Sequence, residues 1–268
     1  MYDFIDESFN RNYLYENKLS IQVSLNGFSF CIQQADDNKI LLFQEPRFVL
    51  SGFHLLARRF KEWCNEEELL KVPYKSREIV INSRNFALIP EQLESENLKK
   101  TISELLPEGR ETEYAEGWIK SVKAKLVYHL PPGFAQTVVE SIGESRLIHP
   151  VQKLIGVQKR TEQADSILLF FDEKDMYLVL KKDHELTLCN IFRINHANDA
   201  IYFILSVLHQ FDIRSKSVNV LTGGKASYLN ELWSMLSKYF PFIGLLKPQA
   251  PESTAIPEEV LSKNVCLF

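Results

Sequence analysis

Near the start of the chain, three short segments carry the alternation of hydrophobic and polar residues that is typical of strands. Residues 19–25, 28–32 and 39–43 are close enough in sequence to form a meander of antiparallel hairpins. The apolar spacing then changes to three and four, which is one face of an amphipathic helix beginning after Pro46. This face consists of Val49, Phe53, Leu56, Phe60 and Trp63. The segment therefore predicts three strands followed by a helix.

The same order of patterns returns in the second half of the chain. Residues 167–171, 176–180 and 185–192 predict three more strands, and residues 199–211 predict a helix that is apolar nearly all round. Residues 166–211 thus repeat the pattern of residues 19–64. An internal duplication of this kind predicts two related α/β lobes that face each other across a cleft.

The remaining segments complete both halves and set the domain division. We expect residues 1–158 to form an amino-terminal lobe with an arm over 1–18 and a linking helix, and residues 159–268 to form a carboxyl-terminal lobe with a short tail. In the first half the predicted elements are strands at 78–82, 86–90 and 121–130, helices at 91–105 and up to Ile142, a loop at 107–116, and a linking helix at 151–158. In the second half they are a strand at 218–221, a helix at 226–239 and a strand at 243–246. Asn195 or Asn198 is the expected cap of the helix over 199–211.

Composition narrows the classes of function. The chain is 45% hydrophobic and 25% charged with a formal net charge of −4, which argues against a general nucleic-acid binder. It contains no apolar run long enough for a membrane span, and its acidic start lacks a signal-peptide core, so the cytoplasm is the expected location. Its four cysteines form no CxxC pair, which argues against structural zinc.

Three turns at the ends of predicted strands contain glycine or carboxylate residues. Asn26-Gly27 follows the first strand and favours a type I′ turn, in which both central residues need positive φ. Asp172-Glu173-Lys174-Asp175 makes the corresponding turn in the second half. Thr222-Gly223-Gly224 stands between a strand and a helix, where glycine permits close backbone approach and a helix start offers free amides.

A meander, helix, strand, helix and strand, given twice with a linking helix, resembles the actin-like ATPase superfamily. Residues 86–90 and the Thr222-Gly223-Gly224 strand end are similar to its pilus-assembly and cell-division branch. Over residues 19–247 the chain also looks like an uncharacterised bacterial family, a domain of unknown function grouped with this fold. The resemblance implies the fold class: α/β, with duplicated actin-like (ribonuclease H-like) lobes, each a mixed sheet with a three-strand antiparallel meander and flanking helices.

The resemblance also implies roles for the loops. Asn26 and Gly27 would contact phosphate, but the strand end Ser24-Leu25-Asn26-Gly27 lacks the carboxylate that positions magnesium in the superfamily. Asp172 and Asp175 are the candidate metal ligands, although carboxylates without a glycine would repel phosphate unless a divalent ion intervened. Thr222, Gly223 and Gly224 would meet adenosine. The plainer interpretations are two hairpin tips and a tight turn between strand and helix.

These altered loops predict a non-catalytic binding or scaffold protein with degenerate nucleotide-binding loops, and no catalytic residue is assigned. ATP and Mg²⁺ are the candidate ligands, without turnover. The alternative is an ATP-binding phosphotransferase or slow Mg-dependent ATPase that uses the inter-lobe cleft. The expected partner is a protein, and a third possibility is a homodimer formed by edge strands of the meanders.

The last residues, Val265-Cys266-Leu267-Phe268, are apolar and follow a polar stretch. They predict a tail that docks on the protein's own surface. The alternative is a short peptide that inserts into the groove of a partner.

Overall fold

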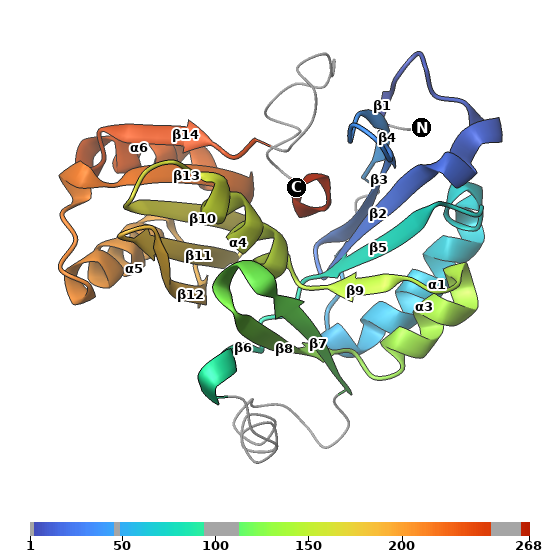
Figure 1. The fold of residues 1–268 in the computed structure, drawn as a ribbon, viewed down its shortest axis with the longest axis horizontal. Helices are drawn as coiled ribbons and strands as arrows, with labels where there is room; N and C mark the ends of the chain where they lie inside the picture. Colours follow the sequence, from blue (N-terminus) through green and yellow to red (C-terminus); the bar gives the residue numbers. More distant parts are fainter. Residues whose placement is uncertain (1–2, 46–48, 94–112, 248–263) are drawn as a thin grey trace. The chain divides into compact units, whose positions relative to one another are not determined.

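The computed structural model describes residues 3–45, 49–93, 113–247 and 264–268. They divide into two compact units: the described residues of Met1–Gln152, and those of Lys153–Pro248 together with 264–266 and Phe268 (Figure 1). The boundary predicted between residues 158 and 159 stays a prediction. Pro46, most of the helix predicted at 91–105, the first half of the loop at 107–116 and the polar stretch before Asn264 lie outside the described residues.

The first unit is built on a mixed sheet with strand order β1-β4-β3-β2-β5-β9. Strands β2, β3 and β4 form the predicted antiparallel meander, whereas β5 runs parallel to β2 and β9 runs parallel to β5. The strands are β1 (Phe4–Ile5), β2 (Asn17–Ser24), β3 (Gly27–Gln34), β4 (Ile40–Gln44), β5 (Ser76–Ile81) and β9 (Arg146–Ile148).

Two helices of the first unit pack against each other and against this sheet. They are α1 (Leu56–Glu66) and α3 (Phe134–Ile142), and Phe60 of α1 contacts Phe134 of α3 with 5.4 Å between ring centroids. The helix predicted from Val49 onward begins later, because a 3-10 turn at Phe53–Leu55 precedes α1. Val49 is 80% exposed, so the apolar face starts at Leu56.

A second, three-stranded sheet of order β6-β8-β7 belongs to the first unit. Its strands are β6 (Phe86–Pro90), β7 (Glu113–Ile119) and β8 (Ala124–Leu130). The predicted loop at 107–116 is wrong for residues 113–116, because β7 is an edge strand whose half-exposed residues carry too weak an alternation to be recognised. His149 is fully buried beside this sheet, between the rings of Phe86 and Tyr128 at 5.2 Å from each. Burial lowers the pKa of His149 to about 4, and its Nε2 bonds to the Ser83 carbonyl at 2.7 Å.

The second unit repeats the main sheet of the first, with strand order β12-β11-β10-β13-β14. Strands β10, β11 and β12 form an antiparallel meander, β13 runs parallel to β10 and β14 runs parallel to β13. The strands are β10 (Ser166–Asp172), β11 (Asp175–Lys182), β12 (Glu185–Arg193), β13 (Asn219–Lys225) and β14 (Phe242–Leu245). The topology matches β4-β3-β2-β5-β9, so the duplication predicted from the pattern is confirmed.

Helices cover both faces of the second sheet, which explains why β10 is apolar at successive positions. Ile167, Leu169 and Phe171 share a core with α5 (Ala197–Gln210) and α6 (Leu229–Tyr239). The alternate residues of β10 point to the opposite face. There α4 (Pro150–Arg160) lies, and its Gln158 donates to the Ser166 carbonyl at 2.7 Å.

The cap of α5 differs from the sequence prediction. His196 caps the helix in place of Asn195 or Asn198, and the Asp199 carboxylate accepts the amides of Asn195 (2.9 Å) and His196 (3.0 Å). The helix is buried along most of its surface, as its apolar composition predicts, and Tyr202 is 67% exposed on the remaining side. No helix of the described part of the chain is long and apolar enough to cross a membrane.

Candidate functional site

The first candidate loop joins β2 to β3 in the first unit. Ser24 pairs with Gly27, so the two loop residues are Leu25 and Asn26, and neither has positive φ. The type I′ turn predicted at Asn26-Gly27 is therefore wrong by one residue. The reason is the Ser24 hydroxyl, which accepts the Asn26 amide at 3.1 Å and donates to the Gly27 carbonyl at 3.2 Å. A side-chain bond of this kind closes a turn without positive φ.

Several polar groups of this loop are bonded within the protein. Ser24 is only 3% exposed, and its hydroxyl is engaged on both sides of the turn. The Leu25 carbonyl accepts the amide of Leu50 at 2.7 Å. Asn26 and Gly27 thus sit at a closed hairpin tip.

The second candidate loop joins β10 to β11 in the second unit. Asp172 pairs with Asp175, and Glu173 and Lys174 form the two-residue turn, with Glu173 at φ 53°. The Glu173 amide donates to the Lys225 carbonyl at 2.6 Å, and the Lys174 carbonyl accepts the amide of Ile194 at 2.7 Å. These bonds tie the tip to the neighbouring strands on both sides.

Negative charge dominates this tip. Burial and the nearby Asp172 carboxylate raise the pKa of Glu173. Burial, followed by the carboxylates of Glu173, Asp175 and Asp199, raises the pKa of Tyr228, whose hydroxyl donates to the Glu173 carbonyl at 2.9 Å. Within the described ranges, no group of three or more His, Cys, Asp or Glu side chains is placed to hold a metal ion.

The third candidate, Thr222-Gly223-Gly224, lies inside β13 and not at the predicted junction of strand and helix, since α6 begins only at Leu229. Gly223 pairs with Phe170 and Gly224 with Phe171 across the parallel ladder. Gly224 has φ +91°, and a Cβ on it would lie 2.0 Å from the Phe171 carbonyl oxygen. Glycine is required there by the approach of β10 to β13. The Thr222 carbonyl accepts the Leu246 amide at 2.8 Å.

Two of the three candidates lie side by side at one end of the neighbouring strands β10 and β13. Asp172 pairs with Lys225, so the acidic tip lies beside the end of β13 just beyond Gly224. Asn26 and Gly27 belong to the first unit.

A segment that was not predicted as part of a site lies at the same end of these strands. Asn264, Val265 and Cys266 are buried, and Asn264 Oδ1 accepts Lys225 Nζ at 3.2 Å. Lys153 Nζ of α4 donates to the carbonyl oxygens of Cys266 and Phe268, both at 3.3 Å.

The ring of Phe268 meets Phe170 edge-on at 6.5 Å. Phe170 points to the face of the sheet that α4 covers. The predicted docking of the tail on the protein's own surface is thus confirmed. The apolar run at 265–268 was the sequence signal, but nothing in it indicated Lys153 or Lys225 as partners.

Two lobes, each with a three-strand meander, two parallel strands and a helix pair, define the actin-like ATPase fold. The chain belongs to the family described as "Protein of unknown function (DUF3822)", whose model matches residues 6–243. No curated protein matches the chain.

Solved structures agree on the fold. A Bacteroides thetaiotaomicron protein with actin-like ATPase fold and unknown function is 19% identical, with a TM-score of 0.79 over 91% of this chain and 95% of that one. The PilM–PilN type IV pilus biogenesis complex is 12% identical, with a TM-score of 0.57 over 93% of this chain and 96% of that one. The resemblance predicted from the sequence is confirmed at the level of the fold.

Proposed function

We propose that this protein is a non-catalytic binding or scaffold protein that kept the actin-like fold and lost its nucleotide machinery. The observation that carries the proposal is the internal bonding of the loops that would hold phosphate. The Asn26 amide donates to Ser24 Oγ, and the Glu173 amide donates to the Lys225 carbonyl. A phosphate loop works by offering free backbone amides, and these amides are already used.

Electrostatics support the same conclusion. At the second tip, Asp172, Glu173 and Asp175 lie within four consecutive residues, and the raised pKa of Glu173 reflects this crowding after burial. Such a tip repels phosphate unless a cation intervenes, and the Ser24–Gly27 loop of the first unit carries no carboxylate of its own to bind one. The fit to a magnesium nucleotide is therefore poor.

The glycines have an alternative explanation that needs no ligand. A Cβ on residue 224 would lie 2.0 Å from the carbonyl oxygen of Phe171, so only glycine fits at this position. Asn264 accepts Lys225 Nζ, so the cation nearest these glycines has an intramolecular partner. In this proposal the binding partner is a protein, and ATP and Mg²⁺ are not required.

A phosphate-release assay with Mg²⁺ and ATP tests the proposal. We expect wild type and Asp172→Asn to be indistinguishable from buffer. Asp183→Asn is the matched control, because Asp183 lies at the other hairpin tip of the same meander, at φ 50°, where asparagine fits. Turnover that Asp172→Asn abolishes and Asp183→Asn preserves would refute the proposal and establish the ATPase alternative.

A further inference from the structure

The segment that precedes β2 is built into the sheet of the first unit. Strand β1 pairs antiparallel with β4, with Ile5 opposite Leu42. The Asp6 amide extends this pairing by donating to the Leu41 carbonyl at 2.9 Å. Ladder bonds of this kind make the segment a part of the sheet.

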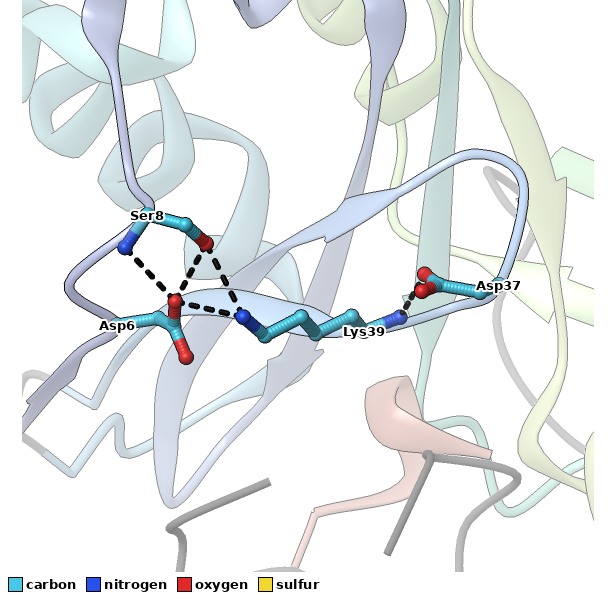
Figure 2. A network of polar contacts seen from close by, with 4 residues as sticks. All are labelled: Asp6, Ser8, Asp37 and Lys39. Carbon is cyan, nitrogen blue, oxygen red and sulfur yellow. Dashed lines mark hydrogen bonds and ion pairs between the residues drawn. The ribbon is translucent and has the colours of Figure 1, made fainter. Parts of the chain in front are cut away.

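A polar latch adds to these bonds (Figure 2). Lys39 Nζ forms an ion pair with Asp6 at 2.9 Å and also donates to the Ser8 hydroxyl at 3.1 Å. The Lys39 amide donates to Asp37 at 2.8 Å, which orders the turn that carries it. Burial works to raise the pKa of Asp6, but the bonds from Lys39 and Ser8 outweigh it and lower the pKa to about 2. Ladder bonds and an ion pair thus hold this segment in place.

The final segment, residues 264–268, is attached to the second unit in a different way. It forms a 3-10 turn, η7 (Val265–Leu267), in which the Phe268 amide donates to the Val265 carbonyl at 3.2 Å. None of the strands in the described part of the chain pairs with it. Its attachment therefore differs from that of β1, since side chains and not a ladder join it to the second unit.

Lysine side chains hold polar atoms at both ends of the final segment. Lys225 Nζ, at the end of β13, donates to Asn264 Oδ1 at 3.2 Å, and Lys153 Nζ of α4 donates to the Phe268 carbonyl at 3.3 Å. Lysine carries its charge on a flexible four-carbon stem. These bonds can therefore break and form again without any movement of the strands.

Apolar side chains complete the attachment. Val265 and Cys266 are fully buried, and the ring of Phe268 meets the ring of Phe170 edge-on at 6.5 Å. Edge-on contact is a favoured arrangement of two aromatic rings. The site thus accepts a short apolar segment that carries an aromatic ring.

This site lies at the end of the sheet where α/β proteins commonly bind their ligands. Strands β10 and β13 run parallel, and Asp172 pairs with Lys225 at their carboxyl ends. Ligands of open α/β sheets bind outside the carboxyl ends of parallel strands. In the second unit, the final segment therefore occupies a position where a ligand is expected.

We propose that this site binds an apolar peptide of a partner protein, and that residues 264–268 fill it as an intramolecular competitor. The partner segment has the chemistry of the one seen here. A side-chain amide accepts from Lys225, two main-chain carbonyls accept from Lys153, and an aromatic ring lies against Phe170. The two lysines disfavour a basic segment, because like charges repel. The inference rests on the proposed function as a binding protein, and it adds the site and the chemistry of the partner.

Attachment to the same chain makes the final segment a strong competitor. A segment tethered through a short connection has an effective concentration on the order of 1 mM. For a peptide that binds the free site with a dissociation constant of about 100 µM, such a competitor weakens binding about 10-fold. Release of the final segment should therefore raise the affinity for the partner by about this factor.

Fluorescence polarisation of a labelled peptide tests the competition. The probe is the amidated peptide of residues 264–268, with a dye on an amino-terminal spacer. In the full chain, Asn264→Ala with Phe268→Ala removes the contacts of the final segment to Lys225 and Phe170. We expect this double variant to bind the probe about 10-fold more tightly than wild type does. Phe268→Ala alone is the milder change; it should give a smaller gain, and it decides the question where the double variant does not fold.

Changes in the site and in the probe identify the contacts. Added to the double variant, Lys153→Met should weaken binding about fivefold, since it removes both bonds to main-chain carbonyls of the peptide. Lys159→Met is the matched control, because Lys159 is an exposed lysine of the same helix, and it should have no effect. A probe with alanine in place of Phe268 should bind at least about 10-fold more weakly. Urea unfolding of each variant verifies that the second unit stays folded.

The outcomes separate this inference from the proposed function. A folded double variant that binds the probe no more tightly than wild type would overturn the inference. Binding that is indifferent to both Lys153→Met and the alanine probe would overturn it as well. Both results leave the proposed function intact, because that function fails on turnover in the phosphate-release assay. Displacement of the bound probe by ATP with Mg²⁺ would overturn both, since it would place a nucleotide in the peptide site.

Discussion

A substitution at Gly224 tests whether the Gly223-Gly224 pair is needed for the structure or for binding a ligand. Its φ of +91° and its pairing with Phe171 place the position of a Cβ 2.0 Å from the Phe171 carbonyl oxygen and 2.4 Å from the Phe171 nitrogen. Both atoms are backbone, so neither can rotate away. Gly224→Ala must therefore strain its own backbone or separate β13 from β10.

The cost of Gly224→Ala has two parts. An alanine at positive φ loses about 1–2 kcal/mol relative to glycine. Forcing an extra methyl group into a close-packed site costs about 1–3 kcal/mol more. The sum of about 2–5 kcal/mol is a large part of the stability of an ordinary domain. We therefore expect the second unit to unfold more readily without any ligand being present.

Urea unfolding followed by circular dichroism, with hydrogen exchange on peptides from β10 and β13, measures this loss. Gly156→Ala is the matched control in the same unit, because a Cβ there has nothing within 4 Å and the residue lies inside α4. It should stabilise the helix by about 0.5–1 kcal/mol. A Gly224→Ala variant within about 0.5 kcal/mol of wild type would refute the structural explanation of this glycine and reopen its assignment to a ligand.

Three further predictions concern the rest of the chain. The unfolding free energy should fall by about 3 kcal/mol as pH drops from about 6.5 to 4, because in this range His149 is protonated in the unfolded chain and not in the folded one. Urea unfolding at each pH measures this dependence. His149→Gln should remove it, whereas His209→Gln, a change at an exposed histidine, should not. The contribution of Asp6 is present above pH 3.8 and lost as pH falls towards 2, so Asp6→Asn should speed hydrogen exchange in β1 and β4 at pH 7 and make no difference below pH 2. Lys153→Met removes the bonds to the carbonyls of Cys266 and Phe268, so hydrogen exchange of the 264–268 amides should accelerate. The free energy of unfolding of the second unit, measured in urea, should change by less than about 1 kcal/mol. Unchanged hydrogen exchange would contradict the docking of the final segment.

The strands of both meanders were predictable because hydrophobic alternation is a local property of the chain. The same pattern predicted the Asp172–Asp175 hairpin, which the pairing of those two residues confirms. The helix pairs were also predicted, although the first turn before α1 was misjudged because Val49 continues the apolar spacing while lying exposed. Period and spacing therefore gave the architecture and left the ends of elements uncertain by several residues.

The candidate site could not be derived in the same way, since its decisive contacts join residues far apart in sequence. The role of Gly224 depends on Phe171 across a parallel ladder, and no local pattern specifies that register. Asn26-Gly27 has the composition of a type I′ hairpin, but the bonds of the Ser24 hydroxyl place the first turn at Leu25-Asn26, one residue earlier. Lys153 as the partner of the final segment was equally invisible to periodicity.

Calorimetric titration of the full chain with ATP in the presence of Mg²⁺ measures whether this protein binds a nucleotide. With the amides of Asn26 and Glu173 already bonded within the protein, we predict no saturable heat and no dissociation constant tighter than about 1 mM. Saturable binding at micromolar ATP, weakened by Asp172→Asn and unchanged by Asp183→Asn, would contradict the proposed loss of nucleotide binding.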